Sequence, residues 1–575
     1  MTEETSPLHH DRIFFWRRCR PAAVLLASAS LFAFLPFSGA HGAVASKPDL
    51  FSAARSIDLL GDVYLQVSEN YVDPVNVAEL MFAGIDGMLA YLDPYTVFLD
   101  EAGSDELDEM TSGRYAGIGI IIGVVSGDLY VTSLLDGYAA SNAGLRIGDM
   151  IVSVDGKMVK HNPSDELKAA IKGPSGTEVT LGIRRTGEHA TRSYTLRREA
   201  IRLSSVPFYA QFDGIAYVQL DSFNEHSVEE LRSALQEMTA TAGNEHLQLK
   251  GIVLDLRGNP GGLLTTAVDV TGLFVDKGSR VVSTRGREPY AEQVYVTRNE
   301  PIEPALPLAV LIDGDTASAS EIVASAIQEL DRGVIVGRGS FGKGLVQSIV
   351  SLPYDHVLKM TTAKYYTPSG RLIQKPLDHG EHQRKVLEGV ERYDSTKVYF
   401  TRSRRKVYGG GGVRPDIEVS AINPSDYRQA LEKQGMFFRF AALYRSQHPV
   451  LQEINLQAGA LLREFNRFVE GGHFVFRSKL RVAFDSLREL AGKDDGPAEK
   501  GLDSTIDTLE KEIVAKNDRM ALQDSSRIAS AVRQELLRHY DAKAGRRAAI
   551  EDDPVAQRAF SLLRNPQRYR ALLKP

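Results

Sequence analysis

Cysteine is almost absent from the sequence, since Cys19 is the only one among 575 residues. A single thiol cannot close a disulfide within the chain and cannot supply the cysteine ligands of a structural zinc site. The thirteen histidines form no HExxH pair and no GDSGG segment is present, which argues against a zinc protease and a trypsin-like protease. The net charge of −6 argues against a nucleic-acid partner. We therefore expect no metal and no other cofactor, and a fold stabilised by a buried apolar core.

The apolar run near the N-terminus is short. Seventeen mostly apolar residues, 21–37, follow a basic cluster that ends at Arg20, and small residues come after them. A membrane-spanning helix needs about 20 apolar residues, whereas this arrangement is typical of a secretory signal peptide. We expect a signal peptide over residues 1–45, cleaved after Ala45 or Ala40, and export to the periplasm or cell envelope. The alternative is an uncleaved segment that keeps the protein at the membrane.

The rest of the chain is long enough for several domains. Helical apolar spacing predicts a small helical domain over residues 47–112, with a mere leader segment as the alternative. Short strands follow over 113–200, and strands alternate with helices over 201–420. A charged insertion at 375–408 is either a flap or a surface excursion. Residues 421–575 are predominantly helical, and their apolar faces pack on the core or on another subunit of a homo-oligomer.

One segment places a serine at the start of a helix. Residues 308–313 are apolar up to the last one, which predicts a buried strand. Apolar residues at helical spacing follow Ser318 up to Leu330, and Gly333 closes the helix. Backbone N–H groups at a helix start stabilise an oxyanion, so a hydroxyl there is well placed to attack a carbonyl. The alternative is structural, because Ser318 and Glu321 also fit a capping box.

A glycine-rich loop with one lysine follows the next predicted strand, residues 334–337. In a desolvated pocket the pKa of Lys343 would fall, and its amine could then take a proton from a serine without any histidine. If the segment is extended, Gln347 lies on the same side and could orient the ammonium; the alternative is a solvated loop cation. The loop also imitates two nucleotide-binding motifs. Gly344, however, replaces the magnesium-binding Ser or Thr of a P-loop, and no HRD or DFG segment accompanies the kinase-like glycines.

Three segments, TASASE at 316–321, FGKGLVQ at 341–347 and DLRGNPGG at 255–262, closely resemble the carboxy-terminal processing (tail-specific) peptidases. The one departure is Thr316, where many relatives carry serine. The resemblance covers roughly residues 50–420. It implies a multidomain α/β and α+β protein in which a crotonase/Clp-like α/β protease core carries an inserted PDZ domain, an N-terminal helical region and a C-terminal helical extension.

The resemblance also implies roles for single residues. Ser318 is expected to be the nucleophile, Lys343 the general base and Gln347 its orienting partner. The N–H of Ala319 is one expected oxyanion donor. The second donor is the N–H of Gly261 or Gly262, a choice that stays open, and the alternative for that glycine turn is a structural role without chemistry.

The segment before residue 200 resembles a bacterial PDZ domain. Its evidence is the Gly117-Ile118-Gly119-Ile120 loop together with segments 140–156 and 172–177. Such a loop binds a C-terminal carboxylate through backbone N–H groups, while the peptide adds a strand to an exposed sheet edge. Leu167 and Ile171, four residues apart on a helix, would line an apolar pocket for the last side chain, or would pack in the core instead.

Together these observations predict an exported serine endopeptidase whose PDZ domain holds a free C-terminus while Ser318 and Lys343 cleave upstream through an acyl-enzyme. The expected partners are proteins or peptides with free C-termini. Two other classes of function stay open: a catalytically inactive scaffold with the same fold, and a PDZ adaptor that presents protein tails to a separate protease.

Overall fold

A computed structural model describes residues 50–161, 163, 165–244, 248–287, 292–375, 397–420, 424–452, 457–471, 474–491 and 500–575. The predicted signal peptide lies outside the described residues. The chain divides into two compact units, Met1–Met81 and Phe82–Pro575. In the first unit, α1 (Leu50–Asn70) leads to the start of α2 (Val77–Ala90). Among the helices described, none is both long and apolar enough to cross a bilayer.

One sheet of the second unit has six strands among the described residues, in the order β10-β11-β12-β15-β16-β21. The pair β10–β11 is antiparallel, and the remaining neighbours pair in parallel. The strands β12, β15 and β16 are wholly buried apolar runs, as expected when both faces of a parallel sheet are covered. The bounds are β10 Phe208–Phe212, β11 Ile215–Gln219, β12 Gly251–Asp255, β15 Leu308–Ile312, β16 Val334–Gly337 and β21 Ile417–Glu418.

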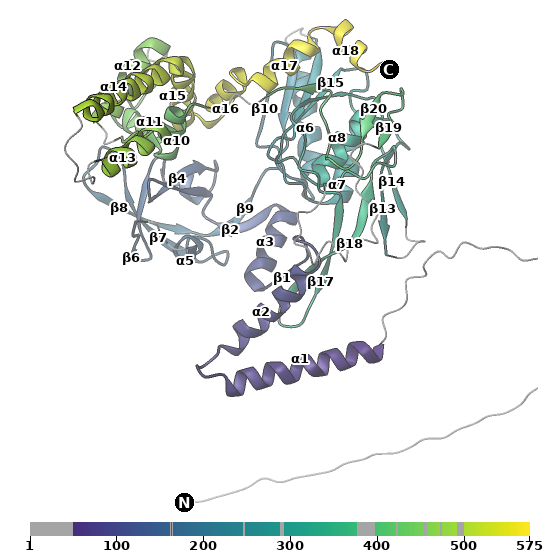
Figure 1. Ribbon diagram of the computed structural model, residues 1–575. Coiled ribbons are helices and arrows are strands. Elements are labelled where there is room, and N and C mark those ends of the chain that lie inside the picture. Colours follow the sequence, from purple (N-terminus) through teal and green to yellow (C-terminus); the bar gives the residue numbers. More distant parts are fainter. Residues whose placement is uncertain are drawn as a thin grey trace, which may run out of the picture. The chain divides into compact units, whose positions relative to one another are not determined.

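Different parts of the chain cover the two faces of this sheet. The helices α6 (Ser227–Asn244), α7 (Leu264–Thr271) and α8 (Ala319–Glu329) share one apolar core with it. On the other face lie side chains of the last helices, α17 (Pro554–Leu563) and α18 (Pro566–Leu572). Both run along the sheet in Figure 1. The C-terminal extension is therefore partly a layer of the core around this sheet.

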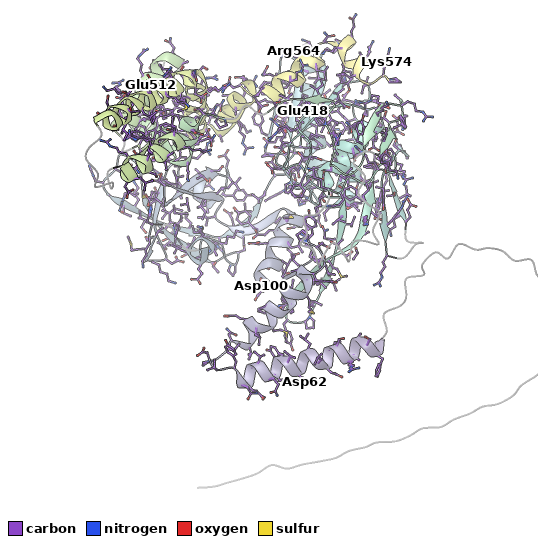
Figure 2. All side chains as sticks on the ribbon, in the orientation of Figure 1. Asp62, Asp100, Glu418, Glu512, Arg564 and Lys574 are labelled. Atoms are coloured by element: carbon purple, nitrogen blue, oxygen red, sulfur yellow. The ribbon has the colours of Figure 1, made fainter. Side chains whose placement is uncertain are left out.

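A second sheet has the order β1-β18-β13-β14, with β17 also paired to β18. Its strands are β1 Val97–Leu99, β13 Arg280–Gly286, β14 Gln293–Val296, β17 Leu345–Ser351 and β18 Val357–Tyr366. Because β1 is an edge strand of this sheet, the segment after α2 folds with the second unit, and not with a helical domain that ends at residue 112. The next helix, α3 (Glu101–Ser112), is capped by Asp100, which is labelled in Figure 2.

The predicted insertion at 375–408 is described only in part. Its last residues form a hairpin of β19 (Val398–Phe400) and β20 (Lys406–Tyr408). Residues 376–396 lie outside the part that the structure describes. The two alternatives for the insertion, a flap and a surface excursion, therefore both stay predictions.

The segment predicted to be a PDZ domain forms a separate antiparallel sheet in the order β3-β4-β5-β7-β8, with β6 beside β5. A two-stranded ribbon of β2 and β9 leads into and out of it. The elements are β2 Arg114–Gly117, β3 Ile120–Val125, β4 Asp128–Leu134, α4 Ala139–Asn142, β5 Met150–Val154, β6 Lys157–Met158, α5 Asp165–Ala169, β7 Glu178–Arg184, β8 Thr191–Arg197 and β9 Glu199–Arg202.

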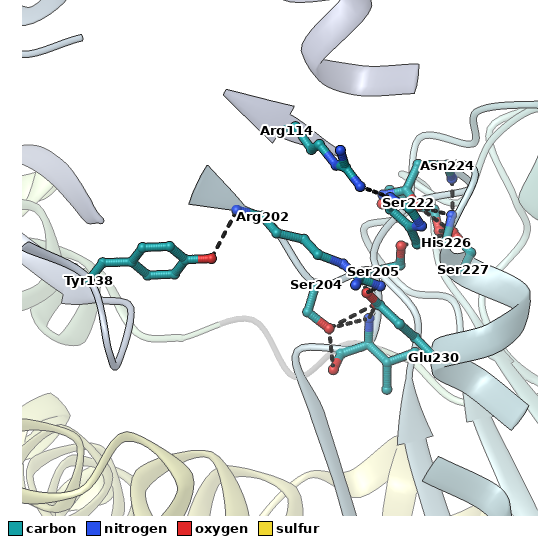
Figure 3. A network of polar contacts seen from close by, with 11 residues as sticks. Arg114, Tyr138, Arg202, Ser204, Ser205, Ser222, Asn224, His226, Ser227 and Glu230 are labelled. Atoms are coloured by element: carbon teal, nitrogen blue, oxygen red, sulfur yellow. Dashed lines mark hydrogen bonds and ion pairs between the residues drawn. The ribbon is translucent and has the colours of Figure 1, made fainter. Parts of the chain in front are cut away.

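A polar network attaches this ribbon to the core (Figure 3). The carboxylate of Glu230 on α6 pairs with Arg202 at 2.8 Å and accepts hydrogen bonds from the Ser204 hydroxyl and the Ser205 N–H. On the PDZ side, the hydroxyl of Tyr138 accepts the N–H of Arg202 at 3.0 Å. One glutamate of α6 thus links the exit of this segment to the core of the mainly parallel six-stranded sheet.

Between β21 and α17 along the chain, six of the helices that the structure describes pack together as a bundle. They are α10 Asp426–Lys433, α11 Met436–Gln447, α12 Ala458–Gly471, α13 Lys479–Ala491, α14 Lys500–Gln523 and α15 Ser525–Tyr540. Buried apolar residues of α15, among them Ile528, Val532 and Leu536, pack against α11 and α12. Ile506 and Ile513 contact Phe484 in a small second cluster. Leu509, on the same helix as Ile506 and Ile513, is 40% exposed.

Candidate active site

The backbone of Ser318 is unusual. The residue follows β15 and precedes α8, as the sequence predicts, with φ +55° and ψ −113°. An ordinary N-cap is extended, with negative φ. A positive φ at a residue other than glycine costs about 1–3 kcal/mol and clusters at active sites. The N–H of Ser318 donates to Glu321 at 2.9 Å, the contact expected of a capping box, but capping alone does not require this conformation.

Glu321 joins the serine to the lysine loop. Its carboxylate is fully buried and accepts the N–H groups of Ser318 (2.9 Å), Gly342 (2.7 Å) and Lys343 (2.8 Å), together with the Ser340 hydroxyl (2.5 Å). Burial raises the pKa of Glu321, and its hydrogen-bond donors oppose this shift. Four donors on two oxygens match an ionised carboxylate, which accepts only. The residue therefore fixes the backbone at Ser318 and at Lys343 from one point.

Lys343 lies in the predicted loop between β16 and β17. Burial lowers the pKa of its ammonium to about 8, and the nearby charge of Lys359 acts in the same direction. Asp93 and Glu321 oppose the shift. The pKa therefore lies far closer to neutrality than that of a solvated lysine, near 10.4.

The side chains of Ser318 and Lys343 make no hydrogen bond to each other among the contacts of the described residues. The Lys343 Nζ instead lies 4.5 Å from the centre of the Tyr95 ring. Tyr95 belongs to the loop between α2 and β1, in the segment Leu92-Asp-Pro-Tyr-Thr96. The sequence shows this turn but gives no indication that it meets a loop 250 residues later.

Gln347 is placed differently from the expectation. Lys343 lies in the loop before β17, which begins at Leu345, so the alternation of an extended strand does not reach from Gln347 back to Lys343. The amide of Gln347 donates to the Thr361 hydroxyl at 3.2 Å. It makes no hydrogen bond with Lys343 among the described contacts.

The glycine turn after β12 lies against the serine. Asn259 is fully buried, and its backbone oxygen accepts the N–H of Ala317 and the hydroxyl of Ser320. A Cβ on Gly261 would approach the Ala319 nitrogen and the Ser318 Cβ to 2.9 Å, so only glycine fits there. Asn259, which nothing in the sequence singled out, therefore holds the turn beside Ser318.

The structure separates the two candidate glycines. The N–H of Gly261 donates to the side-chain oxygen of Asn259 at 2.9 Å and is thus engaged. Gly262 has φ +146° and bridges Phe223 as an isolated parallel pair. In that pair the hydrogen bonds are made by Gly261 O and Leu263 N, which leaves the N–H of Gly262 without an acceptor among the described residues.

Tyr365 on β18 lies behind the site and is fully buried. Its hydroxyl is 2.7 Å from the backbone oxygen of Lys343 and 3.1 Å from that of Ser318. Burial raises the pKa of this phenol well above its usual value, so it stays protonated and donates. Tyr365 thus donates to the backbone oxygens of Ser318 and Lys343, whereas Glu321 accepts the N–H groups of the same two residues.

In the PDZ segment, a cavity of about 300 Å³ opens beside β3. Four of the predicted peptide-binding residues line it: Gly117, Ile118, Ile120 and Ile171. Leu167 does not line this cavity and packs against the PDZ core, and Gly119 lies against Tyr138. An ion pair between Lys172 and Glu109 of α3, 2.8 Å long, also lies at the cavity wall.

Acidic and histidine side chains do not gather into a metal site in the part of the chain that the structure describes. Around Ser318 lie the buried carboxylate of Glu321 and backbone N–H groups, and the same carboxylate accepts the N–H of Lys343, whose amine has a lowered pKa. Such a set matches acyl transfer, in which an amine takes the proton of a hydroxyl and N–H groups stabilise an oxyanion.

Three family models match the chain. Residues 214–379 match peptidase family S41, and residues 130–185 match a PDZ domain. Residues 427–563 match the model described as probable PDZ-protease, C-terminal helical domain. The last match covers a region for which the sequence patterns indicated helices but no function.

Named relatives agree with these matches. The chain is 37% identical over 320 residues to the carboxy-terminal-processing protease of Bartonella bacilliformis, across 56% of this chain and 73% of the relative. It is 30% identical over 353 residues to the carboxy-terminal processing protease CtpA of Bacillus subtilis, across 61% and 74%. A solved structure, the photosystem II D1 C-terminal processing protease, aligns with 27% identity and a TM-score of 0.34, across 68% of this chain and 92% of that one.

Proposed function

This chain belongs to the carboxy-terminal processing proteases of peptidase family S41, and we propose that it cleaves peptide bonds with Ser318 as nucleophile and Lys343 as general base. The observation that carries the proposal is the shared anchor of the two residues. One oxygen of Glu321 accepts the N–H groups of both residues, so the backbones of the strained serine and of the lysine with a lowered pKa lie close together. A structural cap accounts for neither the strain nor the buried lysine.

In the proposed reaction, the neutral amine of Lys343 takes the hydroxyl proton of Ser318 while Oγ attacks the scissile carbonyl. The resulting ammonium then donates that proton to the departing amine, the C–N bond breaks, and an acyl-enzyme remains. A water molecule, deprotonated in turn by Lys343, attacks the ester; the ester C–O bond breaks, the Lys343 ammonium returns the proton to the departing Ser318 Oγ, and a new carboxyl terminus is released. No other cofactor enters the proton balance.

We infer that the oxyanion accepts hydrogen bonds from the N–H groups of Ala319 and Gly262. Ala319 is the first residue of α8, where backbone N–H groups have no partner within the helix. Gly262 is favoured over Gly261 because the N–H of Gly261 already donates to Asn259. Two such donors typically contribute about 10²- to 10³-fold each to kcat.

We further propose that the PDZ groove binds the free C-terminus of a protein substrate. Five isoleucines and Leu203 line it, which fits an aliphatic last side chain, and the edge of β3 offers the backbone groups that a peptide strand pairs with. Export by the N-terminal segment and self-association through the C-terminal helices stay predictions, to be tested by fractionation and by light scattering of the mature chain.

The decisive experiment compares cleavage of an unstructured protein with an apolar C-terminus by the mature chain and by Ser318→Ala and Lys343→Ala. Lys250→Ala, at an exposed lysine remote from the site, is the matched control. We expect cleavage by the parent and the control only, and slower cleavage of a tail-amidated substrate. Equal cleavage by Ser318→Ala would refute the nucleophile. Tail binding by the parent without any cleavage would favour the adaptor or inactive scaffold.

A further inference from the structure

The loop between α2 and β1 is held against the base of the proposed dyad. The Asp93 carboxylate accepts the N–H groups of Tyr95 (2.8 Å) and Thr96 (2.9 Å), which fixes the turn. The Thr96 hydroxyl accepts the N–H of Thr361 at 3.1 Å, and the Thr361 hydroxyl lies 3.3 Å from Asp93. The loop is therefore tied to β18, the strand that also pairs with the lysine-bearing segment.

The ring of Tyr95 faces the Lys343 ammonium at 4.5 Å from its centre, well within the range of a cation–π interaction. Burial, with Glu321 and Asp93 nearby, raises the pKa of the Tyr95 phenol, so the ring faces the ammonium as a neutral phenol. The charged groups around Lys343 are Lys359 on β18, Asp93 on the same loop as Tyr95, and Glu321 on α8.

The amide nitrogen of Gln347 donates to Thr361, and no hydrogen bond joins a side-chain amide to the Lys343 ammonium among the contacts of the described residues. We propose that Tyr95 is the positioning residue for the base: its ring holds the protonated Lys343 in place and releases the amine when the proton is lost. The release follows from the physics of the contact, because the ring quadrupole attracts the ammonium but not the neutral amine. This inference rests on the proposed role of Lys343 as the base.

The proposal has a defined electrostatic sign. A contact made only by the ammonium stabilises the protonated form, so Tyr95 raises the pKa of Lys343 above the value that burial alone would give. Its removal lowers that pKa. A desolvated cation–π contact corresponds to a downward shift of about 0.4–1.5 pH units. A residue that merely supports the fold would change activity and stability without moving this titration.

The test measures the titration of Lys343 directly. Competitive labelling of amines with fluorodinitrobenzene across a pH series, read by mass spectrometry, gives the midpoint for Lys343 in the full mature chain without any need for turnover. The variants are Tyr95→Phe, which keeps the ring, and Tyr95→Leu, which removes it. We expect Tyr95→Phe to keep the parent midpoint and Tyr95→Leu to lower it by about 0.4–1.5 units, with the acid limb of kcat/KM moving equally.

A second series keeps the fold constant. Trifluorophenylalanine at position 95 has nearly the shape of phenylalanine but a weakened quadrupole, so its Lys343 midpoint should fall between those of Tyr95→Phe and Tyr95→Leu. If the Lys343 midpoint in the fluorinated chain equals that of Tyr95→Phe, the proposal is overturned. If Ser318→Ala still abolishes cleavage in that case, the proposed function stands and only the role of Tyr95 fails. Persistent cleavage by Ser318→Ala would refute the function, whatever the midpoint does.

Discussion

Replacement of Glu321 by glutamine tests whether one buried carboxylate holds the site together. The variant keeps the shape of the side chain but turns one oxygen into an NH₂ group. One carboxylate oxygen accepts the Ser340 hydroxyl and the Gly342 N–H, and the other accepts the N–H groups of Ser318 and Lys343. Either orientation of the amide therefore places a donor against donors.

The less costly orientation turns the NH₂ toward Ser340, whose hydroxyl can rotate and accept. The Gly342 N–H is then left without a partner, which costs about 1–3 kcal/mol. The two remaining hydrogen bonds lose the strengthening that a charged acceptor provides, about half of their value. Together we expect a destabilisation of about 2–5 kcal/mol. Because the loop that carries Lys343 is also released, kcat should fall about 10²-fold, the effect of a misplacement near 1 Å.

The assays are urea denaturation of the core and steady-state cleavage of a tail-bearing substrate. Glu329→Gln is the matched control, since Glu329 is also buried on α8, but its carboxylate pairs with Arg371 and accepts the Ser369 N–H instead of an N–H of the lysine loop. It should lose about 3–5 kcal/mol of stability, as a broken buried pair does, and keep its kcat below the denaturation midpoint. Equal loss of kcat in both variants, or no loss in Glu321→Gln, would refute the reasoning.

Three further predictions follow from the same geometry. Below pH 8 the rate should rise about tenfold per pH unit and then level off, because the pKa of Lys343 is lowered to about 8 and only its neutral form accepts a proton; a pH profile of kcat/KM checks this. Gly262→Ala should abolish cleavage because its Cβ would lie 2.3 Å from a backbone oxygen, whereas Gly258→Ala, with φ +70° and open space, should cost only about 1–2 kcal/mol by urea titration. Asp553→Asn keeps the cap of α17 but loses the 2.8 Å ion pair with Arg257, so the urea stability of the core should fall by about 1–3 kcal/mol.

Much of the local structure follows from the sequence. The apolar run before Asp313 is the buried strand β15, and the spacing after Ser318 is the helix α8. Such features need only the residues themselves, because a buried parallel strand is apolar throughout and a helix shows its period within a few turns. The choice between cap and nucleophile, in contrast, depends on a backbone angle that no pattern reports.

The sequence by itself determined the family resemblance, the order of the domains and the residues that could carry acyl transfer. Only the tertiary structure decided their relations. The strand β17 begins only at Leu345, so Lys343 stays in a loop and the expected alignment with Gln347 along one strand does not form. Tyr95 meets Lys343 only because β1 adds to the edge of β18. The reason is physical: local patterns arise from neighbours along the chain, whereas a site is built by contacts between segments whose pairing depends on the packing of the whole fold.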